Sequence, residues 1–154
     1  EALLASPGGY RLTGVDPSAD MLALAQGFVG AAADRVELVE GLVERIDAAP
    51  FDAATACLVL HFLADDGAKL AFLRAVRQRL KPGAPLVIAD VTVDDRAAFE
   101  ALADGLARHA ADIGLPGEVA AAARAAVERM AFADGTVVSE ARQRALFAEA
   151  GFRL

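Results

Sequence analysis

The sequence predicts an α/β protein with a doubly wound, mainly parallel sheet. Short apolar runs alternate along the chain with segments in which apolar residues recur at helical spacing. Two of the apolar runs lack a polar face, as expected for parallel strands that are buried on both sides. Residues that start and end helices separate the two kinds of segment. With 56% hydrophobic and 24% charged residues, the composition is that of a folded globular chain.

The first part of the chain is predicted to hold a strand, a helix and a second strand. Ser18 has the side chain of a helix N-cap, and apolar residues recur at helical spacing after it. The link between residues 39 and 51 is too short for a full helix, so we expect an irregular crossover or one helical turn. The strands are residues 11–15 and 36–39, and the apolar positions of the helix are Met21, Leu24, Ala25, Phe28 and Val29.

The middle of the chain repeats this order of strand, helix and strand. Residues 51–60 are apolar almost throughout after Asp52, and residues 84–91 form a second buried run. Asp65 is expected to cap the helix between them, which Pro82 and Gly83 would end. That helix has an apolar face of Leu70, Leu73, Val76 and Leu80, whereas Lys69, Arg74, Arg77 and Arg79 are expected in water.

From residue 94 onward the pattern is helical. The first helix breaks at residues 114–117, and an alanine-rich helix over about 118–131 and a third over 139–150 follow. We expect residues 94–135 to cover the sheet and select the substrate. The first stripe consists of Phe99, Leu102, Leu106, His109 and Ile113, and His109 is expected to be a half-buried packing residue.

Charge and cysteine content exclude several classes of function. A net charge of −7 argues against nucleic acid as a partner, because such binding needs clustered cations. The single cysteine, Cys57, excludes an internal disulfide and a cysteine-built metal site, and is consistent with a cytoplasmic, reducing compartment. No apolar run approaches the roughly 20 residues of a membrane span. The sequence leaves a monomer and a homodimer open.

Four features fall at the carboxyl ends of successive predicted strands, where ligands of an open parallel sheet bind. Asp16 can accept hydrogen bonds from both hydroxyls of a ribose, and Gly41 allows close backbone approach. Residues 57–61 and Asp90 end the third and fourth strands. Each has a structural alternative: a turn former, a core cysteine or a solvated acid. Their recurrence at strand ends is what indicates a binding site.

These residues resemble the class I S-adenosylmethionine-dependent methyltransferases, whose fold is Rossmann-like. NAD-binding Rossmann domains also end their second strand in an acid but usually lack the other signals. The resemblance rests, in chain order, on Val15-Asp16-Pro17-Ser18 with Met21-Leu22, on Glu40-Gly41, on Phe51-Asp52, on Val59-Leu60-His61 and on Leu80-Lys81-Pro82-Gly83.

The resemblance implies S-adenosylmethionine as cofactor and methyl transfer to a small-molecule acceptor as activity. By that resemblance Asp16 would hold the ribose hydroxyls, with Pro17 and Met21 beside the ribose and adenine. Many relatives have an acid where Leu42 stands, so here only its backbone N–H could serve the adenine. The residues that would border the adenine are Gly41, Leu42 and Val43.

The resemblance also places the methionine part and the chemistry. Cys57 and Leu58 occupy the stretch whose backbone groups usually lie along the methionine moiety of the cofactor. His61 lies where the active-site mouth opens, and it is the one candidate for a catalytic base, since imidazole titrates near neutral pH.

Comparison with the family pattern leads to two further expectations, one about the ends of the domain and one about a branch of the family. The chain, residues 1–154, would be one methyltransferase domain, with the family's first strand and Gly-rich loop expected before Glu1 and its last strand pair after Leu154. The helical segment after Val91 and residues 60–63 resemble a carboxy-S-adenosylmethionine synthase-like branch, which serves tRNA modification. That branch holds the added carboxylate of its cofactor with an arginine of this helical region, and Arg124 lies roughly there. That branch and a non-catalytic cofactor-binding module are the alternatives.

Overall fold

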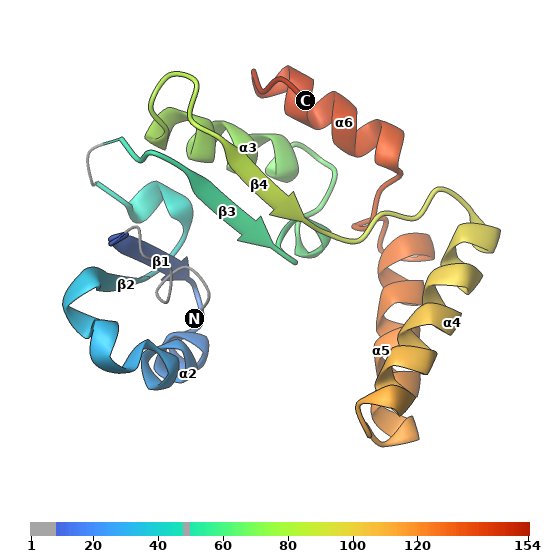
Figure 1. Cartoon of the computed structure of the whole chain (residues 1–154). Helices are drawn as coiled ribbons and strands as arrows, with labels where there is room; N and C mark the ends of the chain where they lie inside the picture. Colours follow the sequence, from blue (N-terminus) through green and yellow to red (C-terminus); the bar gives the residue numbers. More distant parts are fainter. Residues whose placement is uncertain (1–8, 48–49) are drawn as a thin grey trace. The chain divides into compact units, whose positions relative to one another are not determined.

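The computed structural model describes residues 9–47 and 50–154, and the chain divides into two compact units, residues 1–49 and 50–154 (Figure 1). Each unit holds a pair of parallel strands together with helices. The mixed α/β class with parallel strands is therefore confirmed. In the part of the chain that the structure describes, no helix is long and apolar enough to cross a membrane.

Unit 1 is built from strand β1 (Leu12–Asp16), helix α2 (Ala19–Val29) and strand β2 (Val36–Glu40). The strands pair in parallel, so that Leu12 lies opposite Val36 and Asp16 opposite Glu40. The strand–helix–strand order is thus as predicted, and a 3₁₀ helix, Gly30–Arg35, joins α2 to β2.

Two local predictions for unit 1 are confirmed, the N-cap of its helix and the single helical turn after its second strand. Ser18 is the N-cap of α2, because its Oγ accepts the N–H of Met21 at 3.3 Å. One helical turn, the 3₁₀ helix Val43–Arg45, follows β2. The apolar positions of α2 divide, however: Val29 is buried, whereas Met21, Leu24 and Phe28 are exposed. A sheet of two strands is too narrow to cover every apolar position of this helix.

Unit 2 contains the parallel strands β3 (Ala54–Cys57) and β4 (Leu86–Ala89). Strand β3 is shorter than the predicted strand over residues 51–60. At its start Phe51 forms only an isolated bridge, to Leu80. At its end Leu58 leaves the extended conformation and a 3₁₀ helix, Leu60–Phe62, begins.

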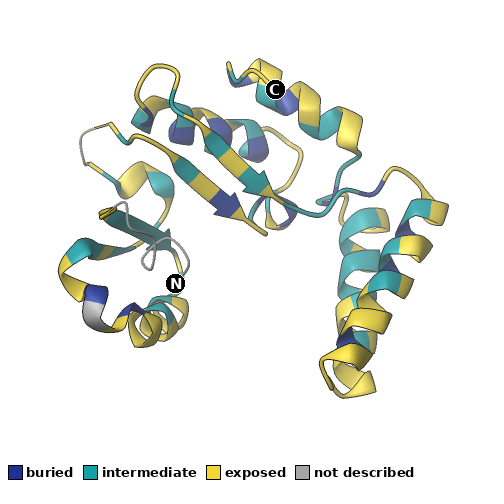
Figure 2. Cartoon of the chain, in the orientation of Figure 1, coloured by how far each residue is buried: buried dark blue, intermediate teal, exposed yellow. Residues whose placement is uncertain are grey.

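Helices α3 (Ala68–Arg79) and α6 (Glu140–Glu149) cover one face of this strand pair (Figure 1). Leu73 of α3 and Leu146 of α6 are fully buried in one cluster, and Leu86 and Ile88 of β4 pack against it. Along both strands these covered positions alternate with exposed ones (Figure 2). The prediction that these strands are covered on both faces is therefore wrong for the described residues, because both helices pack on the same side.

Helix α3 begins differently from the prediction. Its N-cap is Gly67, at φ +114, and the Asp66 side chain accepts the N–H of Ala68 at 3.1 Å. Asp65 is not the cap. It forms a two-pronged ion pair with Arg142 of α6, at 2.9 and 3.0 Å. The hydrogen bonds from Arg142 hold the pKa of Asp65 below its ordinary value of 3.8.

Lys69 is buried, contrary to the expectation that it lies in water. The residue is 1% exposed, and its ammonium donates to the backbone carbonyls of Leu60, Leu63 and Thr136, the last two at 2.6 Å. Desolvation lowers its pKa, and the carboxylates of Asp65 and Asp90 partly oppose that shift. Hydrogen bonds to three carbonyls explain why a cation is tolerated here.

Helices α4 (Arg96–Asp112) and α5 (Gly117–Phe132) are separated by a break as predicted, and they pack as a hairpin (Figure 1). Phe99 is fully buried in a second cluster with Val93, Ala103 and Val137. His109 is exposed, so the prediction that it is a half-buried packing residue is wrong. Leu106 and Ile113 of the same stripe are also exposed. Two helices alone bury a narrow seam, and the distal half of α4 faces small alanine side chains.

Replacing Lys69 by Met should lower the free energy of unfolding by about 2 kcal/mol, because buried carbonyls lose their charged donor. Urea denaturation of the two proteins measures the change. Lys81→Met is the matched control, because Lys81 is the chain's other lysine and its side chain is half exposed. Equal stabilities of all three proteins would contradict a structural role for the Lys69 ammonium.

Replacing Asp65 by Asn should remove a pH-dependent part of the stability. Because the folded pKa of Asp65 lies below the unfolded value of 3.8, the ion pair stabilises fully above that value. The contribution is lost as pH falls through the lowered pKa. The stability difference between wild type and Asp65→Asn in urea should therefore shrink on acidification, whereas Asp112→Asn, at an exposed position, should show no such convergence.

Candidate functional site

The carboxyl ends of β1 and β2 bring together Asp16 and Gly41, two of the predicted site residues. Asp16 is half-buried, its Oδ1 accepts the N–H of Ser18 at 2.8 Å, and its carbonyl accepts the N–H of Gly41 at 3.0 Å. Among the described residues, Oδ2 of Asp16 has no hydrogen-bond partner. One oxygen of the carboxylate is thus held in place while the other can accept hydrogen bonds from a ligand.

Gly41 is required by the turn itself. Its φ is +140°, and an added Cβ would lie 2.8 Å from Cγ of Arg45. A side chain at position 41 would therefore be strained and would displace Arg45. This is a local reason for glycine, and a role toward a ligand remains a prediction.

The other residues predicted for the nucleoside lie at the same edge of the β1–β2 pair. Pro17 and Met21 follow Asp16 and are exposed. Leu42 is exposed after Gly41, and Val43 is half-buried at the start of a 3₁₀ helix. An edge with a carboxylate acceptor and accessible apolar side chains fits a nucleoside, which offers hydroxyl donors and an apolar base.

In unit 2 the carboxyl end of β3 is marked by an unusual backbone conformation. Cys57 is exposed, and the N–H of Leu58 donates to the carbonyl of Ala89 at 2.7 Å as the last bond of the ladder. Leu58 has φ +57°, and among the described residues it is the one non-glycine with positive φ. Such a conformation costs of the order of 1–3 kcal/mol and persists only where the surroundings determine it.

The group that determines this conformation is the carboxylate of Asp90, just beyond the end of β4. Its Oδ2 accepts the N–H groups of Val59 and Leu60, at 3.0 and 2.5 Å. Its Oδ1 accepts the N–H of Val91 at 2.8 Å and lies 2.6 Å from Nδ1 of His61. The Asp90 side chain is completely buried.

His61, the predicted catalytic base, is 7% exposed and is held on two sides. Asp90 contacts its Nδ1, and the ring of Phe62 lies 4.1 Å away, centroid to centroid. Among the described residues, Nε2 forms no hydrogen bond and is not one of the fully buried polar atoms without a partner. Nε2 therefore keeps some access to the surface.

Two residues around His61 have roles that the sequence does not predict. The sequence predicts Asp90 only as a strand-end acid, with a solvated acid as the alternative, and it predicts Lys69 on a solvated helix face. A strand-end acid together with a histidine at the preceding strand end was the available signal for Asp90. No sequence signal marks Lys69, because helical spacing groups it with arginines that are expected in water. In the described part of the chain, no group of three or more His, Cys, Asp or Glu residues could hold a metal.

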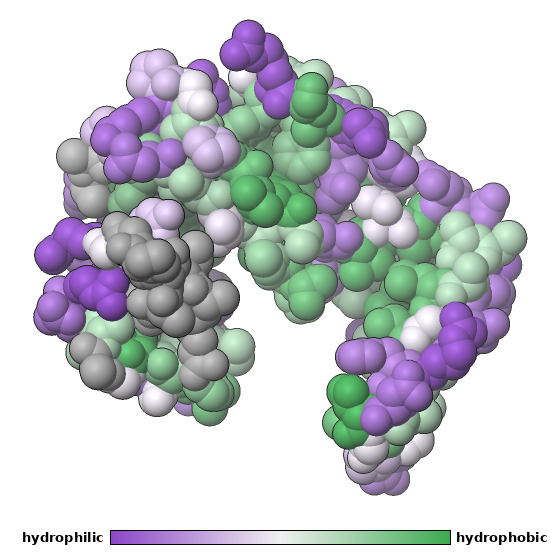
Figure 3. Space-filling model, viewed as in Figure 1, coloured by the Kyte–Doolittle hydropathy of each residue, from purple (hydrophilic) through white to green (hydrophobic). Residues whose placement is uncertain are grey.

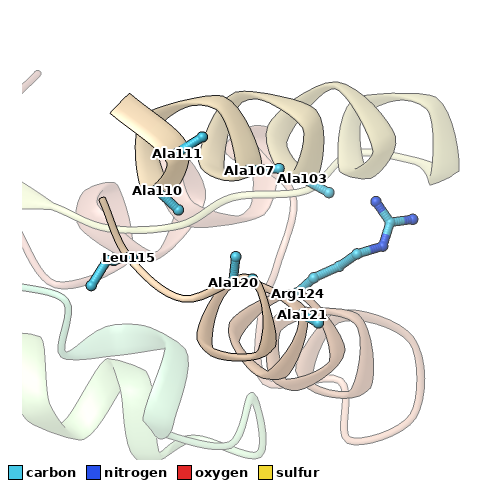
Figure 4. A pocket seen from close by; sticks show the side chains of 9 residues that line it. Ala103, Ala107, Ala110, Ala111, Leu115, Ala120, Ala121 and Arg124 are labelled. Carbon is cyan, nitrogen blue, oxygen red and sulfur yellow. The ribbon is translucent and has the colours of Figure 1, made fainter. Parts of the chain in front are cut away.

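The α4–α5 hairpin contains a shallow pocket of about 320 Å³ lined mostly by alanine methyl groups, with Leu115 at one end and Arg124 at the other (Figure 4). The Arg124 guanidinium lies 2.5 Å from the carboxylate of Glu100 and 5.1 Å from the centre of the Phe99 ring. Apolar and charged surfaces are interleaved over the hairpin (Figure 3). A ligand carboxylate at Arg124 would thus have to compete with Glu100.

Two solved structures resemble this chain in fold. A candidate methyltransferase from Bacillus halodurans C-125 matches with a TM-score of 0.61 and 19% identity, over 94% of this chain and 54% of its own. A candidate exported protein from Bordetella parapertussis matches with a TM-score of 0.64 and 22% identity, over 99% of this chain and 51% of its own. The chain therefore spans about half the length of each.

Comparison with sequence families is more specific. Among curated proteins no sequence matches significantly. A family model described as a methyltransferase domain matches residues 1–86, which include β1, β2, β3 and the turn that carries His61. This match covers more than half of the chain, and on that ground the chain belongs to the methyltransferase domain family.

Proposed function

We propose that this chain binds S-adenosylmethionine and serves methyl transfer to a small-molecule acceptor. The observation that carries the proposal is the carboxylate of Asp16 at the end of a parallel strand, where one oxygen is fixed and the other has no hydrogen-bond partner among residues 9–47 and 50–154. Family membership supplies the reaction class. The ionised carboxylate is the acceptor that ribose hydroxyls require.

Unit 1 supplies the residues proposed for the nucleoside. Asp16 accepts hydrogen bonds from the ribose hydroxyls, and its orientation is maintained by the N–H of Ser18. Pro17 and Met21 contact the ribose and the adenine. The exposed side chains of this edge support that assignment, and the proposed adenine neighbours are Gly41, Leu42 and Val43.

Unit 2 supplies the residues proposed for the methionine part and for proton transfer. Cys57 and Leu58 offer backbone groups at the end of β3. When bound, S-adenosylmethionine supplies a methyl group whose bond to sulfur breaks with its electron pair going to sulfur, as an acceptor lone pair forms the new bond to carbon. His61 removes the proton of the acceptor where that atom still carries one.

The wider setting of the proposal follows the sequence. We propose one Rossmann-like, doubly wound domain, in which residues 94–135 select the acceptor, acting in the cytoplasm on a small molecule rather than on nucleic acid, as a monomer or a homodimer. The pairing of Arg124 with Glu100 gives no support to the carboxy-S-adenosylmethionine branch. A non-catalytic module is the outcome if no cofactor binds.

Replacing Asp16 by Ala should weaken S-adenosylmethionine binding by roughly 10- to 100-fold, because charge-assisted hydrogen bonds to the ribose are lost. Calorimetry on the full-length protein measures the dissociation constant. Asp20→Ala, in the exposed first turn of α2, is the matched control and should bind as wild type. Equal affinities of wild type and Asp16→Ala would refute the ribose assignment. A folded wild type that binds no cofactor would refute the proposed function.

Replacing His61 by Ala should lower turnover by about 10²–10⁴-fold and leave cofactor affinity unchanged, because only the proton acceptor is removed. Formation of S-adenosylhomocysteine with a panel of hydroxyl and amine acceptors is the assay. His109→Ala is the control, because His109 is the other histidine of the chain and is exposed on α4. Unchanged turnover of His61→Ala from pH 6 to 9 would exclude His61 as the base.

A further inference from the structure

We infer that Asp90 is a positioning residue that fixes the Nδ1–H tautomer of His61 and so leaves the Nε2 lone pair to accept the proton of an uncharged acceptor. The inference rests on the proposed role of His61 as a base and adds what that role requires of its surroundings. It is carried by the hydrogen bonds of one buried carboxylate.

The bonds of Asp90 determine where the protons lie. An ionised carboxylate has about four lone-pair positions, and three are occupied by the N–H groups of Val59, Leu60 and Val91. The fourth contact is Nδ1 of His61, at 2.6 Å from Oδ1. Three backbone N–H donors, which cannot reverse, favour the ionised carboxylate, and its remaining lone pair is then the acceptor that faces Nδ1.

The same contact determines the tautomer of the imidazole. Two acceptors do not approach to 2.6 Å, so Nδ1 must donate to Oδ1. A neutral imidazole carries one N–H, and its lone pair is then on Nε2. Rotating the ring by half a turn would place a carbon against Oδ1, which excludes that alternative.

Nε2 is placed so that it can use this lone pair. It has no hydrogen-bond partner among the described residues, and it is not fully buried. The Asp90 carboxylate contacts the ring, and the Lys69 ammonium binds the carbonyl of the preceding residue, Leu60, and is itself attracted by Asp65 and Asp90. Nε2 therefore has the access to the surface that a proton acceptor needs. A histidine with only a packing role would not require this access.

The proton step that follows is simple. The bond between the acceptor's nucleophilic atom and its proton breaks, with the electron pair remaining on the acceptor, and a new N–H bond forms at Nε2. The imidazolium keeps its Nδ1–H on Asp90, which stabilises the positive charge, and the proton then passes to water. The chemical class of acceptor is one that holds a proton on its nucleophilic atom at neutral pH, as a hydroxyl does. An acceptor that is already ionised has no proton on its nucleophilic atom for His61 to remove.

The tautomer can be measured directly by ¹⁵N NMR of the labelled full-length protein at a pH where both histidines are neutral. In wild type we expect His61 to carry its proton on Nδ1 and none on Nε2. In Asp90→Asn the side-chain carbonyl is expected to keep the two N–H groups of Val59 and Leu60 at the expense of the one of Val91, so the amide NH₂ faces Nδ1. The His61 proton should then move to Nε2.

Two controls accompany this experiment. The first is the signal of His109, which is exposed and reports any general effect of a substitution on the histidines. The second is Asp94→Asn, which replaces another aspartate of unit 2 whose Oδ1 accepts a backbone N–H, that of Glu140. This variant should leave the His61 tautomer unchanged. A wild-type His61 that carries its proton on Nε2 overturns the inference whether or not Asp90→Asn folds, and so does an Asp90→Asn tautomer identical to wild type.

A chemical readout separates a poised base from a histidine that only packs. Diethylpyrocarbonate acylates an unprotonated imidazole nitrogen, and peptide mass spectrometry of the reacted full-length protein follows each histidine. We expect His61 to react in wild type and to react at least ten-fold more slowly in Asp90→Asn, with His109 unaffected. No reaction of His61 in wild type would overturn the inference. Failure to bind S-adenosylmethionine would refute the proposed function and leave the tautomer result standing.

Discussion

The buried carboxylate of Asp90 is the interaction on which the cluster at the strand ends of unit 2 depends. A carboxylate without contact with water is stable only when hydrogen bonds compensate its lost hydration. Here four nitrogens do so, three from the backbone and one from His61. To bring the N–H groups of Val59 and Leu60 to one oxygen, the chain has to turn sharply after β3. The positive φ of Leu58 is the conformation that makes this turn.

Once this turn is made, its carbonyls need donors of their own. The Lys69 ammonium serves two of them, at Leu60 and Leu63, and a third at Thr136, so one side chain of α3 connects the turn to the segment before α6. The ion pair of Asp65 with Arg142 joins the same two regions at the surface. The position of the histidine thus follows from a chain of satisfied polar groups, and the neighbouring Leu60 packs in the apolar cluster with Leu73 of α3 and Leu146 of α6.

Most secondary elements could be predicted, because they depend on neighbours in the sequence. Ser18 caps α2 through an N–H three residues away, and apolar periodicity marked the helices of residues 94–150. Predictions were wrong where a distant partner decided. Asp65 binds Arg142, 77 residues along the chain, rather than capping α3, and the buried Lys69 binds carbonyls from two segments that are far apart in the sequence. The end of β3 is likewise set by Asp90, about 30 residues away.

By itself, the sequence determined the α/β class, the order of its strands and helices, and the set of strand-end residues from which a cofactor site is proposed, since periodicity, caps and short motifs are local properties. Only the tertiary structure decided which of these residues hold one another. It showed that Asp90, one acid among many in the sequence, is the partner of His61, and from that contact we infer the proton on Nδ1. The physical reason is that a tautomer and a buried charge depend on the directions and distances of all neighbouring donors and acceptors, and those are set only when strands far apart in the chain end side by side.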